Sequence, residues 1–275
     1  MGSETTNLGP RGVGRYFTIY KLMVRNSLIR ELSFKLNFLL WMVVEGLWFL
    51  GQLAFIEVLY GQVDEIAGWT KWQVVALVGA HQIVSQVFQA FFYINVANLP
   101  ELVRTGRLDL LLTLPVDAQF AVSARQFSLD SLLNALVGVG IVTFAMVKLQ
   151  LVPSAWQIAL CLAALGLGVA VHYAVMFSLA CISFWTVRAA FIHGYFHLFM
   201  IGRYPAAVFR GIFRFIFTWI IPIIWVSNVP AIILTRPFES PWLGLTALTV
   251  GTVVVLAGTR ALWLFCLSRY SSASS

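Results

Sequence analysis

The sequence predicts an all-α membrane protein with six transmembrane helices, and three observations lead to this fold class. Of the 275 residues, 60% are hydrophobic and only 11% are charged. The mean hydropathy is +0.87. A soluble domain carries about 25% charged residues, so this chain lacks the means to build a conventional polar surface. In addition, six apolar segments are each long enough to cross about 30 Å of hydrocarbon at a helical rise of about 1.5 Å per residue.

The six predicted spans divide the chain into three regions. The spans cover approximately residues 36–60, 72–97, 122–148, 155–184, 211–235 and 242–266. We therefore predict a cytoplasmic N-terminal region at 1–35, a six-helix transmembrane domain at 36–266 and a cytoplasmic tail at 267–275. The connections near 98–121 and 185–210 are longer and more charged than the other three.

A helix that lies on the membrane surface is predicted before the first span, at residues 14–34. Basic and small polar residues gather on one side of this helix, whereas Phe17, Tyr20 and Met23 tend to the other side. A basic amphipathic helix with aromatic residues is typical of the membrane interface. We expect it on the cytoplasmic surface of the membrane.

The distribution of basic residues predicts the orientation. Fifteen of the eighteen Lys and Arg residues fall before the first span, in the two long connections, or towards the C-terminus, and only Lys71, Lys148 and Arg236 fall on the other side. We predict that the protein lies in the inner membrane of the cell. The positive-inside rule then places both termini and both long connections in the cytoplasm. The net charge of +7 follows from the same rule, so we do not predict nucleic-acid binding.

The fifth predicted span is irregular. The segment IIPIIWVSNVPAIIL contains Pro222 and Pro230, with Ser227 and Asn228 between them. Each proline removes a backbone donor and bends a helix. Irregular backbone at membrane depth must be buried in protein or line a wet cavity. We therefore expect the outer half of this span to break or to re-enter the membrane, and a helix that is merely kinked is the alternative.

The connection between the second and third spans, PELVRTGRLDLLLTLPVDAQF, is called the 100–120 loop below. Pro100 and Glu101 suit a first helical turn, Gly106 suits a left-handed helix end, and Pro115 ends the leucine-rich run. We predict a short helix across the cytoplasmic face that exposes charged residues and buries leucines. The residues predicted to contact a cytosolic partner are Glu101, Arg104, Gly106, Arg107, Leu108, Asp109 and Pro115. A solvated turn is the alternative.

Polar residues recur inside the predicted spans. Ionisable groups at this depth are costly and usually face a bundle interior or a cavity. By the helical rise, Glu45, His81 and Asp130 lie about 12–16 Å from the cytoplasmic side, so we hypothesise that they form one cluster. The alternative is hydrogen bonding between helices with no role in transport. The candidates for a translocation path or a polar core are Glu45, Gln52, His81, Ser85, Gln89, Asp130, Asn134, Ser227 and Asn228.

No enzyme motif is present in the sequence. The glycine-rich phosphate-binding loop, GxSxG, HExxH and CxxC do not occur, and Cys161, Cys181 and Cys266 lack metal-ligand spacing. We predict no catalytic, cofactor-binding or metal-binding residue. If the function is driven by ATP, the nucleotide must bind to another chain.

Three stretches resemble the membrane subunits of type-two ATP-binding-cassette (ABC) exporters, in the bacterial branch with a separately encoded ATPase. These are LVRTGRLDLLLTLPVDAQF, which resembles the coupling loop, IIPIIWVSNVPAIIL, which resembles the fifth span, and the tail RYSSASS. In the coupling loop, Thr113 and Leu114 stand where the family pattern has a basic residue before the proline.

The resemblance implies a permease subunit that exports a substrate. It implies a second, identical or homologous permease subunit and two ATPase subunits that hold ATP and Mg. It also implies that residues 101–115 sit in a groove of the ATPase and that spans one, two and five line the path. Two other functions stay open from the residues alone. One is a scaffold or assembly protein that holds a cytosolic partner, and the other is an ion-coupled carrier that uses Glu45, His81 and Asp130.

Overall fold

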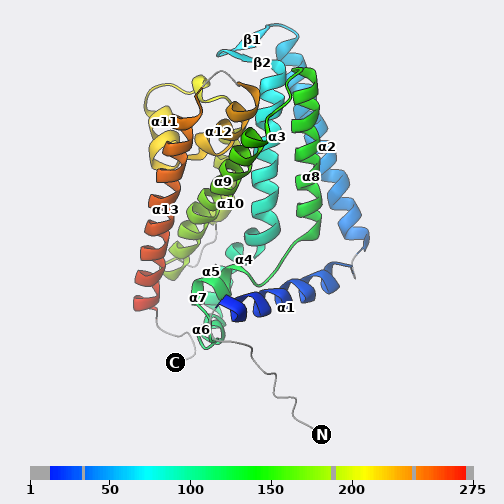
Figure 1. Cartoon of the computed structure of the whole chain (residues 1–275). Coiled ribbons are helices and arrows are strands. Elements are labelled where there is room, and N and C mark those ends of the chain that lie inside the picture. Colours follow the sequence, from blue (N-terminus) through cyan, green and yellow to red (C-terminus); the bar gives the residue numbers. More distant parts are fainter. Residues whose placement is uncertain (1–12, 33–34, 187–189, 237–239, 271–275) are drawn as a thin grey trace.

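The computed structural model describes residues 13–32, 35–186, 190–236 and 240–270. Within these ranges the chain is a bundle of helices, and the strands are confined to a hairpin of β1 (Glu65–Ile66) and β2 (Trp69–Thr70) at one end (Figure 1). Five helices are long and apolar enough to cross a membrane, and a bent pair of helices makes a sixth crossing if it counts as one span. The predicted fold class is confirmed.

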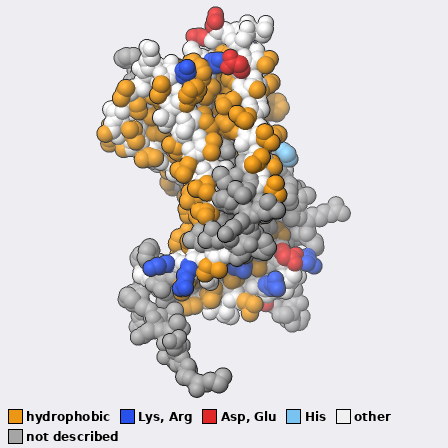
Figure 2. All heavy atoms as spheres, turned by 90° about the vertical axis from the view of Figure 1, so that its right-hand side faces the viewer, with side chains coloured by type: hydrophobic (Ala, Val, Ile, Leu, Met, Phe, Trp, Pro, Cys, Tyr) orange, Lys and Arg blue, Asp and Glu red, His pale blue; other side chains and the backbone are white. Residues whose placement is uncertain are grey.

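The surface agrees with a membrane environment. Figure 2 shows a broad hydrophobic surface along the bundle, with Lys and Arg side chains gathered at one end and a smaller charged group at the other. The second group lies at the hairpin end, where Lys148 packs over Trp72 and Arg236 packs over Trp69. Lys71 pairs there with Glu57 at 2.5 Å. The three basic residues predicted on the outer side therefore lie together at one end.

Helix α1 (Val13–Leu32) lies across the opposite end of the bundle, at a steep angle to the long helices (Figure 1). Lys21 and Arg25 are exposed, whereas Tyr20, Met23 and Val24 are half-buried. Burial raises the pKa of the Tyr20 phenol above its ordinary value. The amphipathic pattern thus produces the surface helix that the sequence predicts.

Helices α2 (Lys35–Tyr60) and α3 (Lys71–Phe88) are joined through the hairpin and have different surroundings. In the apolar window of α2, 11% of the residues are buried, against 78% for the segment that starts with α3. That segment continues through the π-helical turn η1 (Gln89–Tyr93), α4 (Ile94–Ala97) and α5 (Leu99–Arg104). Helix α3 is therefore the centre of the bundle, and α2 presents most of its side chains outwards.

Helices α3 and α8 (Leu129–Lys148) cross closely because glycines face each other. A Cβ atom on Gly138 would lie 2.8 Å from Cγ1 of Ile83, and one on Gly79 would lie 2.8 Å from Cγ2 of Val142. Small residues let helix backbones approach in this way in membranes. Residues 122–128 were expected in the third span, but α8 begins only at Leu129, after the Ser128 cap.

Helix α9 (Ala155–Cys181) returns along the bundle, ends in the 3₁₀ turn η2 (Ile182–Phe184), and packs on α13 (Trp242–Arg269). Between them the chain forms α10 (Ala190–Phe199), the 3₁₀ turns η3 (Met200–Arg203) and η4 (Ala206–Val208), and α11 (Gly211–Phe215). The π-helical turn η5 (Ile216–Ile220) and α12 (Ile223–Thr235) follow.

The predicted fifth span at 211–235 is broken. Its two halves, Gly211–Trp219 and Ile223–Thr235, meet at an angle of 79° at Pro222. Both halves lie in the part of the bundle nearer the hairpin (Figure 1). The expectation of a broken or re-entrant segment is confirmed, and the physical reason is the missing backbone donor of the proline.

Residues 190–210 were expected in a cytoplasmic connection, and this expectation is wrong for most of them. They rise along α9 into the bundle, and η3 reaches the middle of α3. Arg203 therefore lies beside His81, and Arg214 in α11 lies in the half with the hairpin. The prediction from charge failed here because it assigns each basic residue to the nearest loop, and the sequence does not show whether that loop folds back into the bundle. Arg188 lies outside the described residues.

Candidate functional site

The 100–120 loop forms two short helices, α5 (Leu99–Arg104) and α6 (Leu108–Leu112), with a turn between them. Gly106 has φ +68°, the left-handed conformation that glycine adopts without steric cost. Glu101 accepts two hydrogen bonds from Arg104, at 2.7 and 2.9 Å. The predicted helix ending at Gly106 is present. The Asn98 side chain makes no capping bond, because α4 leads almost directly into α5.

The leucines of the 100–120 loop face two directions. Leu108 is fully buried and Leu111 is half-buried, whereas 70% of Leu110, 38% of Leu112 and 37% of Leu114 are exposed. The expectation that the leucines lie together on a buried side is therefore wrong for three of them. The reason is that α6 has only five residues, so a run of consecutive leucines must cover its whole circumference. The three exposed leucines form an apolar patch beside Arg107 and Pro115, which are exposed as well.

Asp109 and the C-terminal Tyr270 lie close together. The burial of Tyr270, and then the neighbouring Asp109 carboxylate, raise the pKa of the Tyr270 phenol. Asp109 is half-buried, whereas Arg104 and Arg107 are exposed as the sequence predicts. Of the predicted contact set, four residues are exposed, Gly106 and Asp109 are half-buried, and Leu108 is fully buried. The exposed ones are Glu101, Arg104, Arg107 and Pro115.

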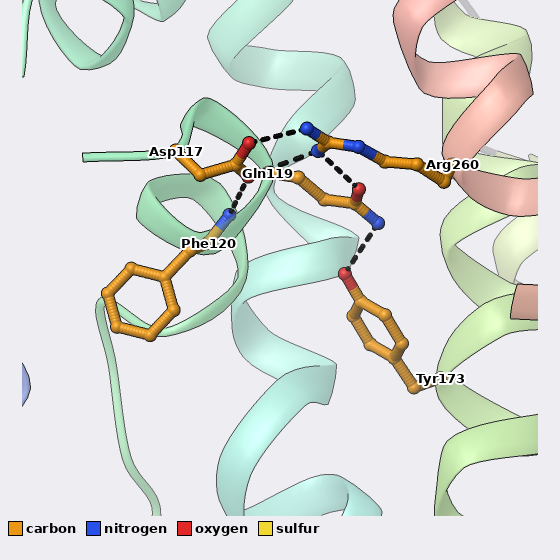
Figure 3. Close-up of polar contacts among 5 residues, drawn as sticks. All are labelled: Asp117, Gln119, Phe120, Tyr173 and Arg260. Atoms are coloured by element: carbon orange, nitrogen blue, oxygen red, sulfur yellow. Dashed lines mark hydrogen bonds and ion pairs between the residues drawn. The ribbon is translucent and has the colours of Figure 1, made fainter. Parts of the chain in front are cut away.

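An ion pair links the end of the 100–120 loop to α13 (Figure 3). The guanidinium of Arg260 donates to both carboxylate oxygens of Asp117, at 2.6 and 3.1 Å, and to Oε1 of Gln119 at 3.0 Å. Gln119 in turn donates to the hydroxyl of Tyr173 on α9 at 3.1 Å, and Ser123 shares that hydroxyl at 2.8 Å. We call these five residues the loop strap. It connects α7 (Ala118–Ser123) to two spanning helices.

Asp117 has two roles in the loop strap. Besides binding Arg260, it caps α7 by accepting from the backbone N–H of Phe120 at 3.1 Å. Burial acts to raise the pKa of Asp117, but the hydrogen bonds from Arg260 and from the Phe120 backbone outweigh it and hold the pKa below the ordinary value of 3.8. The sequence analysis did not select Asp117 or Gln119. A charged residue at position 260, well inside an apolar helix, was the available signal, because such a charge needs a partner.

The predicted cluster of Glu45, His81 and Asp130 forms only in part. Glu45 and His81 line one cavity of about 240 Å³, but they do not bond to each other. Glu45 accepts from the Gln86 amide at 3.3 Å, and His81 bonds to Ser227 of α12 at 3.1 Å. Asp130 lies in the first turn of α8 with Ser128 as its hydrogen-bond partner, and it acts on Glu45 only electrostatically. The depth estimate for Asp130 failed because α8 begins seven residues later than the predicted span.

The other candidate path residues have mixed roles. Ser85 accepts from Gln89, both in the wall of the Glu45 cavity, and Gln52 lines a separate apolar groove. Asn134 is buried in α8. Asn228 accepts from the Ala206 backbone and donates to the carbonyls of Tyr204 and Ile224. Asn228 therefore braces the chain before α11.

Arg203 reaches the same cavity from η3, which the sequence analysis missed. Gly202 makes this approach possible, because a Cβ atom there would lie 3.0 Å from Nδ1 of His81. The cavity thus holds an acidic and a basic side chain, and the amides of Gln82, Gln86 and Gln89 also line it.

A comparison with family models gives the decisive observation for identity. The model described as "ABC-2 family transporter protein" matches residues 47–274, most of the chain. The chain belongs to the ABC-2 transporter family. Comparisons with curated proteins and with solved structures gave no match.

Membership in the ABC-2 family makes the chain a membrane permease subunit of an ABC transporter and a multi-pass membrane protein. It also implies an ABC ATPase as a partner and is usually associated with a dimer. The match includes the 100–120 loop, the bent segment and the tail as far as residue 274, so it covers two of the three resembling stretches completely and the third except for its last residue.

Proposed function

We propose that this chain is the permease subunit of an ABC exporter, and that the 100–120 loop is the surface on which its partner ATPase docks. The observation that carries this proposal is the exposed patch of Leu110, Leu112 and Leu114 beside Arg107. Leucines are unfavourable in water, and an apolar patch with a charged rim is typical of a protein interface. In an ABC permease, the partner that needs such a surface is the ATPase.

ATP and Mg would bind to the partner ATPase, because the sequence has no phosphate-binding loop. We propose two ATPase copies beneath two permease subunits, identical or homologous. The largely exposed α2 supports a second permease subunit, since Val43, Leu50 and Val58 are exposed on it and line neither the groove nor the Glu45 cavity. The excess of basic residues at the end of the bundle that carries α1 and the 100–120 loop supports a cytoplasmic location of that end in the inner membrane, with both termini there.

The loop strap gives the docking surface a mechanical connection to the spans. An ATPase that moves the 100–120 loop displaces Asp117, and the bidentate ion pair carries the displacement to Arg260 on α13. Gln119 carries it to Tyr173 on α9. A partner shifts such an equilibrium only if it binds the two conformations with different affinity. The ATPase must therefore bind the loop differently in its ATP-bound and free states.

The test is to co-express the chain with ABC ATPase subunits of its own source and to measure their co-purification. Substitution of Leu110→Glu with Leu112→Glu places charges in the apolar patch, and we expect it to abolish co-purification. Val152→Glu is the matched control, because Val152 is 95% exposed in the loop between α8 and α9, at the hairpin end. Co-purification that survives the double substitution, or that is lost equally in the control, contradicts the docking assignment.

Family membership favours the ABC permease over the scaffold and the ion-coupled carrier. The carrier needs its three ionisable groups in one site, and Asp130 bonds to Ser128 and does not line the cavity of Glu45 and His81, although it is close enough to act on Glu45 electrostatically. Transport that requires ATP hydrolysis by the assembled complex, and that continues without an ion gradient, is the expected result.

A further inference from the structure

Two cavities of different character meet at the Arg203 side chain. One is the polar cavity of about 240 Å³ that contains Glu45 and His81. The other is an apolar groove of about 540 Å³ between α2, α3 and the segment after η3. Arg203 lines both. Pockets that bind small molecules commonly measure about 300–1,000 Å³ and combine apolar walls with few polar groups.

The walls of the apolar groove are hydrocarbon and aromatic. Leu47, Trp48 and Phe55 of α2 form one side, and Val74 and Val78 of α3 form the other. The groove is open at Gly51, where an added Cβ atom would meet nothing within 4 Å. A chain of methylene groups is therefore well matched to this space.

Arg203 lacks the partners that a guanidinium in such a place requires. Among the described residues it forms no ion pair or hydrogen bond, and its Nε atom is buried without an acceptor. Glu45 is close enough to attract it electrostatically, but the two do not touch. A buried charged group without hydrogen bonds is costly, so an anion that reaches Arg203 would be bound strongly.

We propose that Arg203 binds the acidic head group of a single-chain amphiphile whose hydrocarbon chain occupies the apolar groove. This inference rests on the proposed function, because it names the class of compound that the permease would export. The acidic group is a carboxylate or a phosphate monoester, since both accept two parallel hydrogen bonds from a guanidinium. The amides of Gln86 and Gln89 line the same cavity; each donates one N–H within the protein, to Glu45 and to Ser85, and its second N–H is the donor that we assign to the head group.

The negative charge of Glu45 separates head-group binding from a purely structural role of Arg203. Its carboxylate lines the same cavity as Arg203, so it repels an acidic head group while Arg203 attracts it. Removal of the two charges therefore has opposite effects: Arg203→Gln weakens binding and Glu45→Gln strengthens it. If Glu45 and Arg203 only stabilise each other, both substitutions act in the same direction.

The experiment measures binding to the purified permease in phosphatidylcholine nanodiscs. The probes are lysophosphatidic acid, a free fatty acid and a monoacylglycerol with the same acyl chain, and their binding is measured by native mass spectrometry. We expect the acidic probes to bind more tightly than the neutral one. We expect Arg203→Gln to weaken the binding of the acidic probes by about tenfold or more and to leave the binding of the neutral probe unchanged.

A second pair of variants tests the groove without altering Arg203. Gly51→Leu places a side chain in the open groove and should weaken the binding of all three probes. Gly46→Leu is the control on the same helix, because its Cβ atom also meets nothing within 4 Å and it does not line either cavity. Equal binding of acidic and neutral probes, or equal effects of the two glycine variants, overturns the proposal.

The same variants separate this inference from the proposed function. Arg203→Gln and Gly51→Leu lie far from the 100–120 loop, so both should retain co-purification with the ATPase. If the wild-type chain assembles with the ATPase but does not discriminate among the probes, the inference fails and the proposed function stands. If the chain does not assemble with an ATPase at all, the proposed function fails, whatever the probes show.

Discussion

The ion pair between Asp117 and Arg260 predicts a measurable coupling between the 100–120 loop and α13. We expect the substitutions Asp117→Asn and Arg260→Gln to destabilise the protein less in combination than the sum of their separate effects. Asparagine is chosen because it also caps helices, so the hydrogen bond to Phe120 is kept and only the charge is lost. Arg269→Gln, at the end of the same helix, is the control.

The size of the coupling follows from the geometry. Exposed ion pairs contribute about 0.2–1 kcal/mol. This pair is bidentate at 2.6 and 3.1 Å, and only 35% of the Asp117 side chain and 43% of the Arg260 side chain are exposed. It therefore belongs at the upper end of that range, and we expect an interaction energy of about 1 kcal/mol. This is about a fivefold change in the equilibrium constant.

The assay is a double-mutant cycle on chemical unfolding of the permease in detergent micelles, together with ATP hydrolysis by the assembled complex. Each single variant should reduce the influence of the permease on ATP hydrolysis while the subunits remain assembled. Single effects that add to within about 0.3 kcal/mol would show that the two side chains do not interact. Unchanged hydrolysis in both variants would refute the transmission role of the strap.

Three further predictions follow from the packing and the charges. The pKa of Asp117 is depressed in the folded protein, so the stabilisation by its carboxylate is present above the ordinary pKa of 3.8 and is lost as the pH falls through the folded-state pKa. The difference in melting temperature between wild type and Asp117→Asn should therefore be constant near neutral pH and shrink below about pH 4. Gly138→Ala should destabilise the protein by about 1–3 kcal/mol through its contact with Ile83, whereas Gly140→Ala on the same helix, with open space around it, should not; equal unfolding curves would contradict the close crossing. Asn228→Ala leaves backbone groups near residues 204–206 unsatisfied and should cost at least about 1–3 kcal/mol, measured by thermal unfolding, with faster proteolysis near residue 206 as a second readout.

Much of the candidate site could be predicted because it depends on local sequence. Gly106 and the short helices of the 100–120 loop follow from residues within a few positions of one another. The exposure of Leu110 and Leu112 does not, because it depends on how much of a short helix the bundle covers. Asp117 and Arg260 are separated by 143 positions, so no local pattern indicates that they meet.

The sequence by itself determined the fold class, the number of apolar segments, the surface helix α1 and the break at Pro222. These features follow from hydrophobic length, helical periodicity and the chemistry of proline, all of which act over short distances along the chain. Only the tertiary structure decided that residues 190–203 rise into the bundle and bring Arg203 beside Glu45 and His81. The physical reason is that burial of a basic residue depends on cavities and glycine contacts formed by distant helices, such as the approach of Gly202 to α3. Arg203, which the charge distribution assigned to a cytoplasmic connection, thus lies where the two cavities meet.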